Sequence, residues 1–384
     1  MNRAPVCLSI LWMVSGCTFV PPEPEPAPIE PINLSENAED FGMPVGIRTV
    51  TFEEQTFEVW YPLSEEFEQV GAASIPVDEF IPQSVTDLLG DVSLAPIVSN
   101  AVRDAPPRPI PEPLPVLLFS HGFGGFRTQS NSLCTHLASR GFIVVAPDHP
   151  GRMLGDVLPC VFEPALEGCD LAAIGGSDVA IDDLLAARRY VQGSVDDPDS
   201  FLRGMANPEA LGIFGHSAGG GSAMELGGLD PSFRAILSMA AGASTGANKP
   251  TAIIGGACDA FADPAAMGES LEQLTDGLWV NLLDSGHMPF SDICALDLGG
   301  LADDVLMDRP DVNPTFLNQL LALATSGCPG YEPSPEPICG DEYLGIEEAH
   351  LIIRHYTTRF FDLTLRDRGV PIVDGGFEKA EVFR

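Results

Sequence analysis

Six short apolar runs, which begin at residue 116 of this 384-residue chain, constrain its fold more than any other feature. Each run has four or five residues, which is typical of strands that are buried on both faces of a sheet. The runs are 116–119, 142–146, 211–214, 235–238, 251–254 and 279–283. Helical periodicity separates several runs: one helix is expected over 128–139, and another, capped by Ser177 with Asp178 near its N-terminal dipole, continues to about residue 192. This alternation predicts an α/β fold, with a mainly parallel central sheet covered by helices on both faces.

The segments around these runs complete one predicted domain over residues 45–384. Residues 46–62 alternate in places between apolar and polar side chains and predict an opening β-hairpin. Residues 63–113 are rich in Pro, Asp, Glu and Ser and are expected to form an insertion over the surface, with one short helix near 83–90; a second insertion covers 152–176. A last amphipathic helix is predicted from the helical spacing of Ile346, Ala349, Ile353, Tyr356 and Phe360.

The N-terminal residues 1–17 have the features of an export signal. The apolar stretch from Ala4 to Val14 is too short to span a bilayer, and Ser15-Gly16-Cys17 resembles the lipobox of bacterial lipoproteins. That resemblance implies cleavage before Cys17 and lipid on Cys17; the alternative is an ordinary secretory signal that is cut nearby. Residues 18–44 are rich in Pro and Glu and favour a stiff linker. We therefore expect a lipoprotein of the cell envelope, or otherwise a periplasmic or secreted protein.

The cysteine content is consistent with export. Nine cysteines are present, and Cys7 and Cys17 lie in the signal segment. Three disulfides are candidates, although the sequence leaves the connectivity open: they are Cys160–Cys169, Cys258–Cys294 and Cys328–Cys339. Cys134 would remain, and a buried free thiol is the simplest expectation for it. No set of cysteines and histidines has zinc-ligand spacing, so no metal is expected.

The charge balance restricts the partners of this chain. Its formal net charge is −36, from 55 acidic and 19 basic residues. A surface this acidic repels nucleic acids and anionic membranes, so membrane association is expected only through an N-terminal lipid anchor. The sequence does not determine an oligomeric state.

One glycine-rich motif lies where a predicted strand meets a predicted helix. Gly215-His216-Ser217-Ala218-Gly219 follows the run 211–214 and has the pattern G-x-S-x-G. Glycines relieve crowding in such a tight turn, which would hold the Ser217 hydroxyl above the sheet and close to a helix N-terminus. Ser217 is therefore the candidate nucleophile.

A serine hydroxyl needs a base to take its proton. In α/β-hydrolases, whose nucleophile turn this motif resembles, the base follows the nucleophile in the chain, which leaves His287, His350 and His355. The last two lie on the predicted terminal helix, whereas His287 follows the strand 279–283 directly. His287 is the candidate base, and His216 is expected to be a packing residue.

An acid must hold the base in the correct tautomer. The strand 235–238 is followed by no carboxylate, but Asp259 and then Asp263 follow the strand 251–254. Asp259 is the leading candidate and Asp263 is the second. A Cys258–Cys294 disulfide would join the acid loop to the base loop.

Acyl transfer also needs donors for the negative oxygen of its tetrahedral intermediate. The backbone N–H of Ala218 is one candidate, and the N–H of Phe123, in the glycine-rich loop after the strand 116–119, is the other. Arg127 and Arg152 could steer an anionic substrate group, although surface ion pairing is the simpler expectation.

Four stretches of the chain resemble one group of α/β-hydrolases. The group includes platelet-activating-factor acetylhydrolases, dienelactone-hydrolase-like proteins and cutinase-like polyester hydrolases. The stretches are Val116–Arg127, Gly141–Gly151, Gly215–Gly221 and Ser285–Cys294. The resemblance covers roughly residues 45–370 and implies the α/β-hydrolase fold and no cofactor. The position of Asp259 matches the cutinase-like proteins, because acetylhydrolases take their acid from the preceding strand. Dienelactone hydrolases proper use cysteine where this chain has Ser217.

The resemblance implies a carboxylic ester hydrolase with a Ser-His-Asp triad and an acyl-enzyme intermediate. Short-chain acyl esters or acetylated phospholipid-like molecules are the expected substrates. The alternatives are a cutinase-like polyester depolymerase, which an insertion covering Ser217 would disfavour, and a non-catalytic surface-binding lipoprotein.

Overall fold

A computed structural model describes most of the chain after residue 41. The described residues are 42–67, 73–89, 96–162, 180–242, 248–259, 261–295, 344–368, 372 and 376–384. The lipobox-like Cys17, the linker 18–44 up to residue 41 and most of the insertion 152–176 lie outside these residues.

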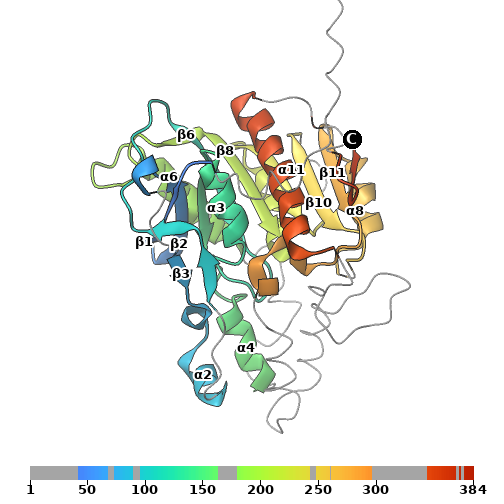
Figure 1. The fold of residues 1–384 in the computed structure, drawn as a ribbon, viewed down its shortest axis with the longest axis horizontal. Coiled ribbons are helices and arrows are strands. Elements are labelled where there is room, and N and C mark those ends of the chain that lie inside the picture. The colour runs from blue at the N-terminus through green and yellow to red at the C-terminus, as the bar shows by residue number, and fades with distance from the viewer. Residues whose placement is uncertain are drawn as a thin grey trace, which may run out of the picture. The chain divides into compact units, whose positions relative to one another are not determined.

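A ten-stranded sheet forms the centre of the fold (Figure 1). Its strands are β1 (Val45–Phe52), β2 (Gln55–Pro62), β5 (Ala101–Arg103), β6 (Leu114–Ser120), β7 (Ile143–Pro147), β8 (Ala206–His216), β9 (Phe233–Met239), β10 (Thr251–Gly256), β11 (Gly277–Leu282) and β12 (Ala380–Phe383). Their order across the sheet is β12-β11-β10-β9-β8-β6-β7-β2-β1-β5. The six strands from β11 to β7 are parallel, so their carboxyl ends meet at one edge.

Antiparallel pairs occur toward both edges of the sheet, although the edge strand β5 pairs parallel with β1. β1 and β2 form the predicted opening hairpin, and β2 pairs antiparallel with β7. At the opposite edge β12 pairs antiparallel with β11. The central strands are buried on both faces, as their continuous apolar sequences predict.

Helices cover both faces of the sheet. The longer helices are α3 (Asn131–Ser139), α4 (Leu154–Phe162), α6 (Ile181–Ser194), α7 (Ala218–Leu229), α8 (Pro264–Leu271) and α11 (Ile346–Arg366). Side chains of α3 and α11 belong to one buried apolar cluster, and those of α6, α7 and α8 belong to another on the opposite face. The apolar stripe of α11 is buried as its spacing predicts, with Ala349, Ile353 and Tyr356 in the first cluster. The structure thus has the predicted α/β architecture.

The shorter elements lie mainly in the first insertion and around the base loop. They are η1 (Glu65–Phe67), β3 (Ala73–Ile75), η2 (Val77–Phe80), α2 (Gln83–Leu89), β4 (Ile97–Ser99), η4 (Met288–Phe290) and η5 (Asp292–Ala295). Figure 1 shows α2 and α4 beyond one end of the large sheet. Within the described residues, no helix is long and apolar enough to cross a membrane.

One expectation about these segments needs correction, and another lies outside the described residues. The insertion 63–113 does not only run over the surface, because Ile75, Val77 and Ile97 are buried in the core and β5 adds an edge strand to the main sheet. Short β-branched and apolar pieces between polar residues gave too weak a period to predict these strands. The helix α6 begins at Ile181 in the described part of the chain, and the predicted cap Ser177 lies outside it.

Candidate active site

Ser217 lies in a sharp turn between β8 and α7. Its backbone has φ 55° and ψ −124°, a left-handed conformation that costs a non-glycine residue about 1–3 kcal/mol. Two close approaches show why glycines flank it: a Cβ on Gly215 would lie 2.2 Å from the carbonyl oxygen of Gly219, and a Cβ on Gly219 would lie 2.1 Å from that of Ser120. The turn therefore projects the Ser217 hydroxyl at the N-terminus of α7, where the helix dipole favours negative charge.

The structure brings Ser217, His287 and Asp259 together in one chain of hydrogen bonds. His287 Nε2 lies 2.8 Å from Ser217 Oγ, and His287 Nδ1 lies 2.8 Å from Asp259 Oδ2. The other carboxylate oxygen of Asp259 accepts hydrogen bonds from the backbone N–H groups of Phe261 and Ala262, at 2.8 and 2.9 Å. Asp259 and His287 are buried, and Ser217 is half-buried. Because the carboxylate binds the Nδ1–H, Nε2 is left as an acceptor toward the hydroxyl.

The alternative residues occupy other positions. Asp263 caps α8, where its carboxylate accepts a hydrogen bond from the N–H of Ala265 at 2.9 Å. His350 and His355 lie on α11, and His350 Nε2 lies 3.3 Å from the carbonyl oxygen of Ser291. None of these three has a hydrogen bond to Ser217 or His287 within the described residues.

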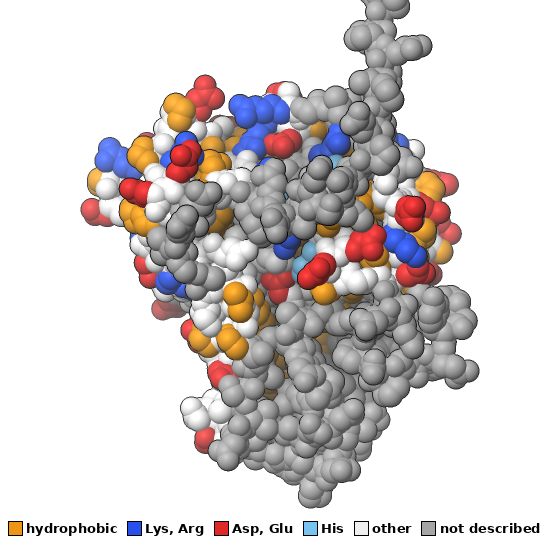
Figure 2. Space-filling view, in the orientation of Figure 1, with side chains coloured by type: hydrophobic (Ala, Val, Ile, Leu, Met, Phe, Trp, Pro, Cys, Tyr) orange, Lys and Arg blue, Asp and Glu red, His pale blue; other side chains and the backbone are white. Residues whose placement is uncertain are grey.

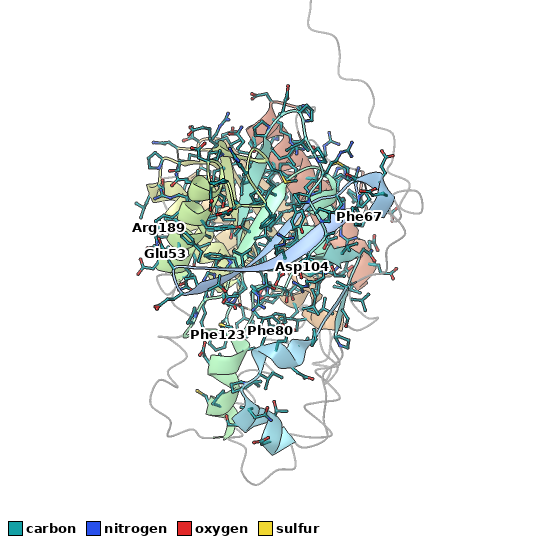
Figure 3. The ribbon with its side chains drawn as sticks, turned by 90° about the vertical axis from the view of Figure 1, so that its left-hand side faces the viewer. Glu53, Phe67, Phe80, Asp104, Phe123 and Arg189 are labelled. Carbon is teal, nitrogen blue, oxygen red and sulfur yellow. The ribbon has the colours of Figure 1, made fainter. Side chains whose placement is uncertain are left out.

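The loop after β6 lies directly against the serine. A Cβ on Gly122 would lie 3.2 Å from the Cβ of Ser217. The next residue, Phe123, is half-buried, and its N–H has no hydrogen-bond partner among the described residues. In Figure 3, Phe123 lies at the end of the sheet nearest to α2 and α4. The N–H of Ala218 opens α7, where the first N–H groups have no partner within the helix. Both expected donors thus lie in segments that border Ser217.

A buried relay that the sequence did not predict connects this loop to the base loop. The N–H of Gly122 donates to Gln129 Oε1 at 3.1 Å, Gln129 Nε2 donates to His216 Nδ1 at 2.8 Å, and His216 Nε2 donates to the carbonyl oxygen of His287 at 2.9 Å. Burial and then the neighbouring His287 lower the pKa of His216 to about 3, so its ring stays neutral. His216 is a packing residue with both ring nitrogens bonded, as expected.

Both arginines of this region have buried partners. Arg152 is fully buried and donates to Ser120 Oγ and to the carbonyl oxygen of His121. Arg127 is nearly buried and pairs with Glu58 and Asp148. Ion pairing is confirmed for Arg127, which also reaches the exposed Glu79 at 3.8 Å, although its other two partners are buried. A surface position was wrong for Arg152, which is too deep to contact a substrate group. A polar residue between apolar runs gives no signal in the sequence for such burial.

The cysteines agree with part of the expectation. Cys160 and Cys258 are each disulfide-bonded, and Cys134 is a buried free thiol. Cys169, Cys328 and Cys339 and the side chain of Cys294 lie outside the described residues, so the three pairings stay predictions. In the described parts of the chain, no cluster of three or more His, Cys, Asp or Glu residues could hold a metal ion.

Charged groups are mixed on the described surface. On the face in Figure 2, acidic, basic and apolar side chains are interspersed and do not form one patch of a single sign. The arrangement of a hydroxyl, an imidazole and a carboxylate beside the backbone N–H groups of Phe123 and Ala218 is suited to nucleophilic attack on a carbonyl group.

Comparison with known proteins finds similarity to a family model, to a curated protein and to a solved structure. Residues 49–153, less than half of the chain, match the model of the family "Platelet-activating factor acetylhydrolase, isoform II". A 38-residue stretch is 50% identical to platelet-activating factor acetylhydrolase from Gallus gallus, and it covers 10% of this chain and 9% of that protein. A solved structure of a ferulic acid esterase from Streptomyces cinnamoneus aligns with a TM-score of 0.55 and 22% identity over 89% of this chain and 97% of that one.

These similarities establish the fold. The chain has the α/β-hydrolase fold and resembles platelet-activating factor acetylhydrolases in its N-terminal part. The sequence match spans about a tenth of the length of the curated relative.

Proposed function

We propose that this protein is a carboxylic ester hydrolase in which Ser217 is the nucleophile, His287 the general base and Asp259 the acid that orients it. The observation that carries the proposal is the unbroken chain from Ser217 Oγ through both nitrogens of His287 to Asp259, with each step at 2.8 Å. The likeness to acetylhydrolases and to the fold of an esterase supports the same reaction class.

In the proposed reaction, Ser217 Oγ attacks the ester carbonyl carbon while His287 Nε2 takes the hydroxyl proton. The carbonyl oxygen becomes negative and accepts hydrogen bonds from the N–H groups of Phe123 and Ala218. The C–O bond to the alcohol then breaks, and His287 returns the proton to the leaving oxygen. Water, deprotonated by His287, then attacks the acyl-enzyme carbonyl carbon. The bond from that carbon to Ser217 Oγ breaks, His287 returns the proton to Ser217 Oγ, and the acid is released.

The proposed substrates are short-chain acyl esters or acetylated phospholipid-like molecules. The match of residues 49–153 to the acetylhydrolase model supports this choice. The position of Phe261 further supports a substrate with an apolar portion. Phe261 is 46% exposed, and its ring centroid lies 5.5 Å from that of His287. An exposed aromatic ring beside the base offers an apolar contact to a bound ester. We further propose that the protein is exported, as its N-terminal residues predict.

The test is Ser217→Ala, with Ser84→Ala on the exposed surface of α2 as the matched control. The wild type and Ser84→Ala should hydrolyse p-nitrophenyl acetate and react covalently with a fluorophosphonate probe. Ser217→Ala should do neither, while it keeps the circular dichroism spectrum of the wild type. Turnover by Ser217→Ala would contradict the assignment, and a folded wild type without turnover or labelling would favour a non-catalytic binding protein.

The substrate class is tested with p-nitrophenyl esters of increasing acyl length, an acetylated phospholipid and a polyester film. Preference for short acyl chains supports the proposal. Release of soluble products from the film at rates comparable to the small esters would favour a polyester depolymerase.

A further inference from the structure

A second serine, histidine and aspartate are aligned behind the candidate active site. Ser120 Oγ lies 2.9 Å from His149 Nε2, and His149 Nδ1 lies 3.0 Å from Asp183 Oδ2. Ser120 and His149 are fully buried, and Asp183 is 6% exposed. No substrate reaches a hydroxyl in such a position, so the array has a different use from that of Ser217.

The array fixes the direction of each hydrogen bond in it. Burial raises the pKa of Asp183 to about 7, so above that pH Asp183 is ionised and can only accept. His149 Nδ1 then carries the proton, and Nε2 accepts from the Ser120 hydroxyl. Burial lowers the pKa of His149 well below its ordinary value, which keeps that ring neutral. The Ser120 oxygen is then left to accept a hydrogen bond, and it receives one from Arg152 Nη2 at 2.9 Å.

Arg152 joins the two segments that carry the expected oxyanion donors. Its Nη2 also donates to the carbonyl oxygen of His121 at 2.8 Å, and its Nη1 donates to Ser222 Oγ in α7 at 3.1 Å. Ser222 Oγ in turn donates to the carbonyl oxygen of Ala218 at 3.1 Å. One planar guanidinium group therefore connects the loop after β6 to the first turns of α7.

The backbone of Arg152 holds the same loop at a second point. Its carbonyl oxygen accepts a hydrogen bond from the N–H of Gly124 at 2.9 Å. The side chain is bonded to His121 and the main chain to Gly124, so Phe123 lies between two anchor points on one residue.

The His121 ring restrains the peptide that carries the Phe123 N–H. His121 Nδ1 donates to the carbonyl oxygen of Gly122 at 2.8 Å, and its Nε2 accepts from the N–H of His149 at 3.2 Å. A trans peptide is planar, so holding the Gly122 oxygen fixes the opposite direction for the Phe123 N–H. The loop and helix are also in direct contact, since a Cβ on Gly219 would meet the carbonyl oxygens of Ser120 and His121 at 2.1 and 2.5 Å.

We propose that Arg152 is a positioning residue for the oxyanion hole: its buried guanidinium group sets the separation between the N–H groups of Phe123 and Ala218. This inference rests on the proposed ester hydrolysis. In this proposal, the Ser120–His149–Asp183 array holds the Ser120 oxygen toward Arg152. A lysine in place of Arg152 would keep a charge but lack the rigid fork that reaches the loop and the helix together.

The experiment measures kcat and KM of Arg152→Lys and Ser222→Ala on p-nitrophenyl acetate, together with the inhibition constant of an alkyl boronic acid. The boronic acid forms a tetrahedral adduct with a nucleophilic serine, so its affinity reports on the oxyanion hole. Arg366→Lys is the matched control, because Arg366 also donates to two backbone carbonyl oxygens, those of Arg140 and Gly141. These two residues lie just before β7, whereas Ser217 follows the carboxyl end of β8.

For Arg152→Lys we expect kcat to fall about 10- to 100-fold with little change in KM, and boronic acid affinity to fall in parallel. In Ser222→Ala, Arg152 loses its contact with α7 but keeps those with Ser120 and His121, so kcat should fall less. The kcat of the double variant should be no lower than that of Arg152→Lys, because both changes break the same connection between the loop and α7. Arg366→Lys should lose thermal stability without losing kcat.

Two results would overturn the inference while leaving the proposed function intact. One is an active, labelled wild type whose Arg152→Lys variant keeps kcat and boronic acid affinity and loses only stability, as Arg366→Lys does. The other, decisive if Arg152→Lys does not fold, is an unchanged kcat and boronic acid affinity in Ser222→Ala. An inactive wild type would instead refute the proposed function itself.

Discussion

The ring of His216 donates a hydrogen bond from Nε2 to the carbonyl oxygen of His287 at 2.9 Å, so the residue beside the candidate nucleophile supports the candidate base. The two rings are 5.0 Å apart between centroids, and only a neutral His216 avoids placing a second positive charge beside a protonated His287. Gln129 completes the arrangement, because its amide donates to His216 Nδ1 and accepts from the N–H of Gly122.

Replacement of Gln129 by leucine should therefore reduce activity as well as stability. The variant leaves His216 Nδ1 and the Gly122 N–H without partners in a buried site, which costs about 1–3 kcal/mol for each group. Because Gly122 precedes the expected oxyanion donor, we expect kcat on p-nitrophenyl acetate to fall while KM changes little. Steady-state kinetics and urea unfolding measure the two effects. A variant that is less stable but has the wild-type kcat would show that the relay has only a structural role.

The acid can be identified by a pair of substitutions at neighbouring positions. Asp259→Asn should lower kcat about 10³- to 10⁴-fold, because an amide that donates to His287 Nδ1 selects the wrong tautomer. Asp263→Ala should keep its kcat and lose only about 1 kcal/mol of stability, since it removes the cap of α8. Steady-state kinetics and thermal melting of both variants decide the matter. The reverse pattern of activities would assign the acid to Asp263.

The strands and the triad were predictable because each leaves a local signal. Continuous apolar runs predicted the buried strands, and chain order with the ends of strands singled out His287 and Asp259. Gln129, His149 and Arg152 left no such signal, since each has a partner 28 or more positions away in sequence: His216, His121 and Ser120 respectively. The edge strands β5 and β12, of three and four residues, are likewise defined by pairing and not by their own composition.

Reduction of the disulfide at Cys258 should affect activity more than fold. Cys258 directly precedes Asp259, and its N–H donates to the carbonyl oxygen of Ser285 in the base loop at 2.9 Å. Loss of the covalent bond loosens the acid loop, and a displacement of about 1 Å at a catalytic group can cost about 10²-fold in rate. We expect Cys258→Ser to lower kcat with its circular dichroism spectrum retained, whereas Cys160→Ser in α4 should keep kcat. Equal rates for both variants would contradict this expectation, and peptide mapping under non-reducing conditions would test the pairing with Cys294.

Acid should destabilise the protein partly through His136, a residue of α3 whose ring contacts α11. Its Nε2 is 3.2 Å from Thr358 Oγ1, and burial, followed by the charges of Arg354 and Arg140, lowers its pKa to about 3. The unfolded chain has a histidine pKa of about 6.5, so below that pH it binds a proton that the folded state excludes. The stability that His136 contributes is fully present above pH 6.5 and is lost as the pH falls toward 3. We expect the stability difference between the wild type and His136→Gln to shrink by about 1.4 kcal/mol per pH unit below 6.5, or about 2 kcal/mol at pH 5. Urea unfolding of both proteins from pH 7 to pH 5 measures this difference, and a constant difference over that range would show that His136 does not exclude the proton.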